Sequence, residues 1–417
     1  MKKWKLHTPE GVLDVLENEC AKKRQVEDAI RRSFHSEGYF EVQTPSFEFL
    51  DVFYGEGGSF DQSEMIKFFD RSGRIMALRP DMTTSIARIC ATKYHDGFPK
   101  RLCYVGSAFR DGSAAAGVLQ KEFTQAGIEL IGQSGSAADA EVIAAAVRAL
   151  LACGMTEFQL DIGQAEFFKG IMEQADLDDE TAEQMRRLID QKSFVAVEEL
   201  VSGLHMDDDL KALILSLPNL FGGIEVIDKI KTKPLGARAR AALANLVEIY
   251  DILRDYGVEK YISIDLGQVQ EINYYTGVIV KGFTYGMGFP ICGGGRYDNL
   301  IGEFGGTRVP ATGIAIGIER VISALRHAEF AFELPCAHTL VCTDGHRRTA
   351  FRIAEGLRHS GLCVETWNGE GAEDYARFRG MGGIVRVIDQ DTLDVINLND
   401  GQTTRTSISE LIGGDFE

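Results

Sequence analysis

Four short segments of the chain place charged or amide side chains beside turn residues, where they could bind a small ligand. In the first segment, Asp81 and Thr83 follow an expected strand at 75–78, so their oxygen atoms could receive an ammonium group. The same spacing suits a structural role, in which Asp81 caps the helix that follows. The residue types alone leave both interpretations open.

The second segment combines Arg110, a loop of small residues at 112–117, and the side chains of Gln125 and Glu129. Two strands joined by this loop would bring the three side chains to a similar height, where they could line one pocket. A plain β-hairpin has the same spacing, so the pattern does not decide between the two.

The third segment pairs Tyr274 and Tyr275 with a triple glycine at 293–295. Glycines let a backbone approach a ligand closely, but this run matches neither common phosphate-binding glycine pattern. In the fourth segment an expected strand leads into a helix that carries Glu319 and Arg320. A structural interpretation pairs Arg320 with Glu319 or with another acid.

The composition limits the classes of function. With 417 residues, 45% hydrophobic and 25% charged, the chain is long enough to fold around more than one core. Its formal charge of -18 argues against nucleic acid and anionic membranes as partners. The eight cysteines are scattered without metal-ligand spacing, so we expect no metal site. The N-terminus does not resemble a signal peptide and no apolar stretch could span a bilayer, which favours the cytoplasm.

Periodicity predicts a mixed α+β core over residues 1–330. Helices are expected at 17–37, 138–153 and 317–327, and strands at 39–43, 75–78, 101–109, 129–131, 158–162, 261–266, 274–283 and 289–292. Between about 167 and 257 helical periodicity dominates, with a possible break at 218–223, so we expect a helical insertion that interrupts one sheet. Residues 335–417 alternate three strands (339–343, 363–366, 383–388) with two helices (349–360, 372–379), which predicts a separate α/β module.

Several motifs, in family order over about residues 5–325, resemble histidyl-tRNA synthetase and its relatives. They are Gly11-x-x-Asp14, Leu78-Arg79-Pro80-Asp81, Phe109-Arg110, Glu122-Phe123-x-Gln125-x-Gly127-x-Glu129, Tyr274-Tyr275-x-Gly277, Gly293-Gly294-Gly295-Arg296-Tyr297-Asp298 and Gly317-x-Glu319-Arg320. The resemblance implies the class II aminoacyl-tRNA synthetase core, an antiparallel sheet flanked by helices with a cleft for histidine and ATP. It also implies a dimer formed through the first helix and strand. The last module resembles a shortened anticodon-binding domain.

The resemblance assigns site residues by position. Asp81 and Thr83 align with groups that receive the histidine ammonium, Gln125 with a second amino-acid contact, and Glu129 and Tyr275 with groups that read the imidazole. The full set of implied histidine-binding residues is Asp81, Thr83, Arg110, Gln125, Glu129, Tyr274 and Tyr275, with Arg110 near the carboxylate and Arg320 in the residual nucleotide site.

The sequence departs from a working synthetase in the residues that would stabilise charge during adenylation. Gln270 stands where the family has its catalytic arginine, with the acid Glu271 beside it, and residues 113–120 contain no cation. Loss of one preorganised donor typically costs about 10²- to 10³-fold in rate. Residues 335–417 hold 8 arginines, no lysine and 13 acids, a net charge of -5 that suits RNA poorly. We therefore expect no catalytic residues and no cofactor.

A retained histidine pocket without adenylation residues resembles the regulatory subunits of ATP phosphoribosyltransferase. That resemblance implies a non-catalytic subunit that joins the short-form catalytic subunit in a hetero-oligomer, permits the first step of histidine biosynthesis and carries feedback inhibition by L-histidine. Two alternatives stay open on the residues alone. One is a histidine-adenylating enzyme of the synthetase class, and the other is a free-standing histidine sensor with a different partner.

Overall fold

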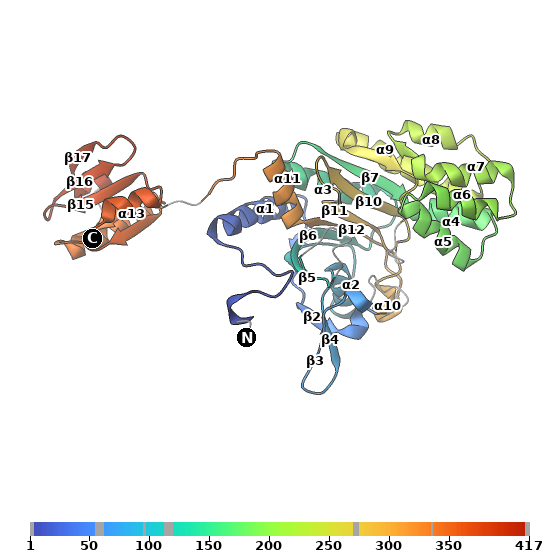
Figure 1. Cartoon of the computed structure of the whole chain (residues 1–417), viewed down its shortest axis with the longest axis horizontal. Coiled ribbons are helices and arrows are strands. Elements are labelled where there is room, and N and C mark those ends of the chain that lie inside the picture. Colours follow the sequence, from blue (N-terminus) through green and yellow to red (C-terminus); the bar gives the residue numbers. More distant parts are fainter. Residues whose placement is uncertain are drawn as a thin grey trace. The chain divides into compact units, whose positions relative to one another are not determined.

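A computed structural model describes residues 4–54, 62–94, 97–111, 120–269, 275–334 and 337–412. The chain divides into two compact units, Met1–Phe332 and Glu333–Glu417. Both combine helices with a sheet (Figure 1), as the α+β expectation requires. Among the described residues, every helix is either too short or too polar to cross a bilayer.

The first unit is built on a nine-stranded mixed sheet (Figure 1). In spatial order its strands are β1 (Phe40–Glu41), β5 (Lys100–Phe109), β6 (Glu122–Ile131), β12 (Ala311–Gly317), β11 (Cys292–Arg296), β10 (Val278–Thr284), β7 (Phe158–Gln164), β9 (Ile262–Asp265) and β8 (Phe221–Gly222). Only the pairs β1–β5 and β7–β9 are parallel. The six strands from β5 to β7 form the antiparallel centre that the resemblance implies.

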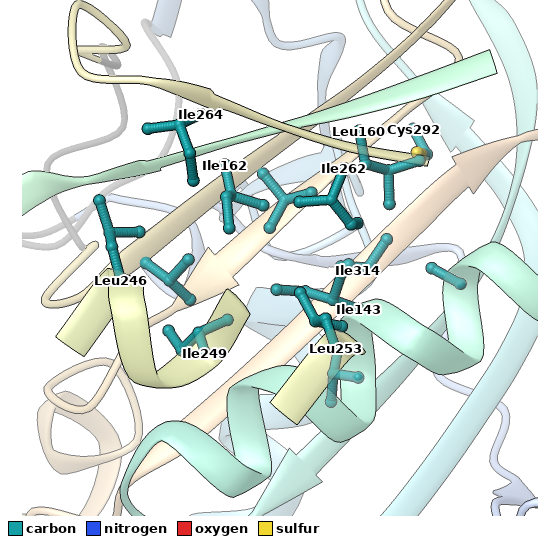
Figure 2. Packing of buried hydrophobic residues seen from close by; sticks show 14 of the residues in the cluster. Ile143, Leu160, Ile162, Leu246, Ile249, Leu253, Ile262, Ile264, Cys292 and Ile314 are labelled. Carbon is teal, nitrogen blue, oxygen red and sulfur yellow. The ribbon is translucent and has the colours of Figure 1, made fainter. Parts of the chain in front are cut away.

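Helices cover one face of this sheet, and the described residues leave the centre of the other face open. The covering helices include α1 (Glu17–Ser36), α3 (Ser136–Ala152), α9 (Ala237–Asp255) and α11 (Ile318–His327). Figure 2 shows Ile143 of α3 and Leu253 of α9 packed toward strand residues such as Ile162 and Ile314. Successive strand residues point to opposite faces, so Gly313, next to Ile314, and Asp161, next to Ile162, face the other way. Their cross-strand partners Glu129 and Lys281 share that face, which gives a ligand a small and polar surface.

The expected helical insertion is present. Its helices are α4 (Ala165–Gln174), α5 (Asp179–Asp190), α6 (Phe194–Ser202), α7 (Asp208–Ser216), α8 (Glu225–Ile230) and α9. α5 begins where the side chain of Asp178 accepts a hydrogen bond from the Thr181 N–H at 2.8 Å, and it buries Met185 and Ile189 at four-residue spacing. The expected break at 218–223 contains the short 3-10 helix η5 (Leu217–Asn219) and β8, which adds an edge strand beside β9.

A second, three-stranded sheet leads into the helix at the cleft. It pairs β2 (Phe47–Phe49) and β3 (Lys67–Phe69) with β4 (Ile75–Leu78), and α2 (Thr83–Thr92) follows. Arg79 lies buried at this junction and donates hydrogen bonds of 2.7 Å to the carbonyl oxygens of Ser107 and Thr44. This arginine therefore holds the small sheet against β5.

Several expected strands have different bounds. The strand expected at 289–292 is wrong: β11 starts at Cys292, because Pro290 has no N–H to donate to a ladder. β10 starts at Val278 instead of 274, and the first strand shrinks to Phe40–Glu41. β6 is longer than expected, since its polar first half pairs fully with β5. The described part of this unit also contains the short helices α10 (Gly302–Gly305), η1 (Trp4–Leu6), η2 (Leu50–Val52), η3 (Gln62–Glu64) and η6 (Glu259–Tyr261).

The second unit contains the expected three strands and two helices with an additional hairpin. Its sheet order is β14 (Val364–Trp367), β13 (Thr339–Cys342), β15 (Gly383–Val387), β16 (Thr392–Asn397) and β17 (Thr403–Ser407), with helices α12 (Arg347–His359), α13 (Ala372–Phe378) and α14 (Ile408–Ile412). The hairpin β16–β17 escaped prediction because β17 is polar throughout and mostly exposed, so it lacks the apolar alternation of a strand.

Candidate ligand-binding cleft

A cavity of about 810 Å³ opens on the uncovered face of the nine-stranded sheet. Its wall combines the start of α2, the facing strands β6, β11 and β12, and side chains of α1 and α11. A volume of this size falls within the usual range for small-molecule sites.

The structure brings most of the sequence-predicted site residues together. Asp81, Thr83, Arg110, Gln125, Tyr275 and Arg320 all line the cavity. Glu129 is 1% exposed and lies below its surface, in contact with two lining residues. Tyr274 and Gln270 lie outside the described residues.

Glu129 is a buried carboxylate held by two hydroxyl groups. The hydroxyl of Thr83 donates to Oε1 at 2.8 Å, and the hydroxyl of Tyr297 donates to Oε2. Burial raises the pKa of Glu129 to about 7, although both hydrogen bonds act in the opposite direction. This side chain can therefore gain or lose a proton near neutral pH.

Glycine at position 313 makes the burial of this carboxylate possible. Gly313 of β12 lies directly opposite Glu129 of β6, and a Cβ atom at Gly313 would overlap Glu129 Oε2. In the triple glycine, a Cβ on Gly295 would lie 2.9 Å from Cε1 of Tyr275. Gly313 thus makes room for Glu129, and Gly295 for Tyr275. Gly293, Gly294 and Gly313 also line the cavity.

Asp81 and Gln125 present acceptors that suit an ammonium group. Asp81 is buried, which raises its pKa, while the guanidinium of Arg110 acts to lower it. Asp81 Oδ1 also accepts a hydrogen bond from the Thr84 N–H at 3.3 Å. Asp81 therefore both caps the helix that follows and lines the cavity. Among the described residues, no donor reaches the buried Oε1 of Gln125.

Two arginines of the cavity bind backbone carbonyl oxygens and stack on aromatic rings. Arg110 donates through Nε to Pro80 O at 3.1 Å, and its guanidinium lies 5.5 Å from the ring centre of Phe123. The second arginine, Arg320, also binds a carbonyl group and an aromatic ring. It donates to Pro290 O and lies 5.1 Å from the ring centre of Phe289.

Glu319 is drawn away from Arg320 by two other partners. Lys23 of α1 pairs with Glu319 at 3.0 Å, and the Thr124 N–H donates to its other oxygen at 2.9 Å. The structural interpretation, in which Arg320 pairs with Glu319 or with another acid, is therefore wrong for the described residues. The glutamate instead joins α11 to α1 and β6, and Arg320 binds a carbonyl group.

Sequence reasoning missed several cavity residues, among them Lys281 and the hydroxyl donor Tyr297. Lys281 is the one charged residue in the apolar strand Val278–Thr284, a signal that could have marked it. The role of Tyr297 depends on its contact with Glu129, 168 positions earlier, which no local pattern reveals. Within the described ranges no group of three His, Cys, Asp or Glu side chains is arranged to hold a metal ion.

Sequence comparison finds one matching family model and relatives that share a single description. The histidyl-tRNA synthetase family model matches residues 11–321. A protein of Acetivibrio thermocellus is 50% identical over 418 residues, which covers 99% of this chain and 100% of that one. A protein of Ruminiclostridium cellulolyticum is 42% identical, with 99% of both chains covered. Both relatives are described as ATP phosphoribosyltransferase regulatory subunits.

Solved structures confirm the synthetase-like fold. A Bacillus halodurans protein, described as an ATP phosphoribosyltransferase regulatory subunit/histidyl-tRNA synthetase, aligns with a TM-score of 0.84 at 27% identity and covers 93% of this chain and 100% of that one. The histidyl-tRNA synthetase of Nostoc sp. aligns with a TM-score of 0.82 at 23% identity, with 97% of both chains covered. The second likeness concerns the fold alone.

Proposed function

The chain belongs to the family of ATP phosphoribosyltransferase regulatory subunits, built on the histidyl-tRNA synthetase fold, and from this premise we propose that it binds L-histidine in the cleft and transmits feedback inhibition to a catalytic partner. The names of the relatives support a regulatory role, without chemistry of its own, in the first step of histidine biosynthesis. The partner we propose is the short-form ATP phosphoribosyltransferase catalytic subunit, in the cytoplasm.

The hydroxyl groups around Glu129 carry the proposal for histidine. When Glu129 is ionised, Thr83 and Tyr297 each donate their single proton to it, and their oxygen atoms can then only accept hydrogen bonds from a ligand. An imidazole N–H is a donor of the right kind for this end of the cleft. The negative charge of Glu129 behind both hydroxyls adds a preference for a ligand with positive charge.

The remaining cleft groups suit the backbone atoms of an amino acid. Asp81 and the Oε1 atom of Gln125 offer acceptors to an ammonium group, and the guanidinium of Arg110 offers charge to a carboxylate. A hydrogen bond to a charged group contributes about 1.5 to 3 kcal/mol. Three or four such bonds are enough for metabolite affinity after the costs of binding.

Adenylation fits this chain poorly. Gln270 replaces the arginine of the synthetase motif, and residues 113–120 supply no cation for ATP. We therefore propose that the synthetase cleft persists as a sensor and that Arg320 is the remnant of a nucleotide site.

Feedback inhibition requires that histidine bind two states of the complex with different affinity. The coupling in such systems is typically about 1 to 3 kcal/mol, and it acts equally on ligand and partner. We propose self-association through the first helix and strand as part of this assembly. The edge strand β1, whose Phe40 side chain is exposed, supports that choice.

The test is the rate of phosphoribosyl-ATP formation by a short-form catalytic subunit, with and without this chain, across a histidine titration. We expect the chain to raise the rate and histidine then to suppress it. A Glu129→Gln chain should still raise the rate but should lose the suppression. A catalytic subunit that is folded and active yet indifferent to this chain would contradict the proposal.

A further inference from the structure

Two cations of the helical insertion bind backbone carbonyl groups at the edge of the cleft. Lys169 of α4 donates through Nζ to Tyr275 O at 3.4 Å, and Arg186 of α5 donates through Nη1 to Val269 O at 3.5 Å. Tyr275 lines the cleft, and Val269 is the last described residue before the segment 270–274. The insertion therefore forms hydrogen bonds to the chain on both sides of that segment.

A third contact joins the same two parts of the molecule. Asp190, the last residue of α5, lies 3.6 Å from the ammonium nitrogen of Lys281, which lines the cleft from β10. The side chains of Asp190 and Lys281 are 32% and 23% exposed, so water screens this pair only in part.

A second cavity of about 510 Å³ lies beside these polar contacts. It is lined by residues of α4 and α5, including Lys169 and Arg186, and Tyr275 lines both this cavity and the cleft. Close apolar packing normally fixes one element against another, and the buried faces of α4 and α5 do pack into the main core. Beside the cavity, the hydrogen bonds of Lys169 and Arg186 add a polar connection to Tyr275 and Val269.

α5 belongs to the body of the insertion. It packs on α6 and on η5, and its buried residues Met185 and Ile189 belong to the main apolar core. A shift of the insertion would therefore carry Arg186 and Asp190 with it. The carbonyl of Val269 and the ammonium of Lys281 would then lose their partners.

We propose that Arg186 and Lys169 are positioning residues for the cleft and that α4 and α5 couple its occupancy to the helical insertion, an inference that rests on the proposed histidine site. Neither side chain lines the cleft; each acts through a backbone carbonyl group. By reciprocity, a ligand that fixes Tyr275 must also fix the insertion. Loss of the hydrogen bonds from Arg186 and Lys169 must then lower the affinity for the ligand.

The test combines histidine calorimetry with amide hydrogen exchange on the full chain. Arg186→Met should weaken histidine binding about 5-fold or more and Arg186→Lys should recover part of the loss. The matched control is Arg187→Met, one position along the same helix at an exposed residue, for which we expect unchanged affinity. Histidine should slow exchange in α5 of the wild type and of Arg187→Met, but not of Arg186→Met.

Exchange without ligand separates this inference from the proposed function. Arg186→Met should speed exchange in peptides that cover 262–269 and 275–280, and Arg187→Met should not. If the wild type binds no histidine while this difference persists, the positioning role stands and the proposed ligand is wrong. If histidine binds equally well to the wild type, Arg186→Met and Lys169→Met, and exchange is the same in all three, the insertion does not position the cleft.

Discussion

The hydroxyl of Thr83 donates to the buried carboxylate of Glu129 across 2.8 Å, which joins the first turn of α2 to the C-terminal part of β6. Tyr297 binds the other oxygen of the same carboxylate from the end of the triple-glycine segment. Three distant parts of the chain thus meet at one acid. Both hydroxyls are left with only acceptor capacity toward the cleft.

Replacement of Glu129 by glutamine should weaken histidine binding at least tenfold. The amide removes the negative charge, and its NH₂ group must donate to one hydroxyl, which then turns its own proton elsewhere. Isothermal titration calorimetry measures the affinity, and circular dichroism checks the fold. Glu199→Gln, at an exposed position of α6, is the control and should bind as the wild type does. Equal affinities in all three proteins would show that histidine does not bind at this end of the cleft.

The same substitution should change how stability depends on pH. The pKa of Glu129 rises from its ordinary value of 4.5 to about 7 in the folded protein, so the folded state holds the proton more tightly than the unfolded state. The contribution of this group to stability should therefore fall by up to about 3 kcal/mol as pH rises from about 4.5 to about 7. Above that pH it should stay level.

Urea unfolding at pH 5 and pH 8 measures that dependence. The Glu129→Gln protein lacks the titrating group, so it should gain stability relative to the wild type as pH rises. A constant difference between the two proteins across this range would contradict the raised pKa of Glu129.

Gly313→Ala should disturb the carboxylate from the neighbouring strand. The new methyl group would overlap Glu129 Oε2, and overpacking of this kind typically costs about 1 to 3 kcal/mol. The free energy of unfolding and the affinity for histidine should both fall. Gly203→Ala is the control, because a Cβ there would meet its nearest atom at 3.6 Å. Normal stability and affinity in Gly313→Ala would show that β12 has room for a larger residue.

Asp139→Asn should strongly destabilise the first unit, because it removes one partner of a buried ion pair. Asp139 lies 2.9 Å from Arg296, with side chains only 2% and 8% exposed, and removal of one buried partner typically costs about 3 to 5 kcal/mol. Asp251→Asn breaks a pair of the same 2.9 Å length with Arg254 on an exposed helix face, where about 0.2 to 1 kcal/mol is usual. Chemical denaturation compares the two, and similar losses would contradict the dependence on burial.

Gln270→Arg alone should not create adenylation activity. An arginine at this position would still have no cationic partners in residues 113–120, which contain none, and catalysis of this reaction depends on several preorganised charges together. Pyrophosphate exchange with histidine and ATP is the measurement. Sustained exchange in the variant would mean that one arginine at this position is enough for adenylation. Exchange in the wild type would favour the adenylating enzyme instead.

The sequence by itself determined the elements and the family. Four-residue spacing places Val26, Ile30 and Phe34 on one face of α1, and all three are buried. The order of motifs from Gly11 to Arg320 predicts the synthetase-like fold that the solved structures confirm. Such signals are local, because hydrophobic periodicity and turn residues act within a few positions of each other.

The tertiary structure decided which of the charged residues serve the fold and which face the cleft. Arg79 and Arg296 belong to the motifs shared with histidyl-tRNA synthetase, yet both are buried and bind oxygen atoms of the protein itself. Lys281, outside every motif, faces the cleft instead. The partners of these side chains lie tens to hundreds of positions away, so strand order and register bring them together, and no local pattern encodes that distance. The same reason hid the contact of Arg186 with Val269.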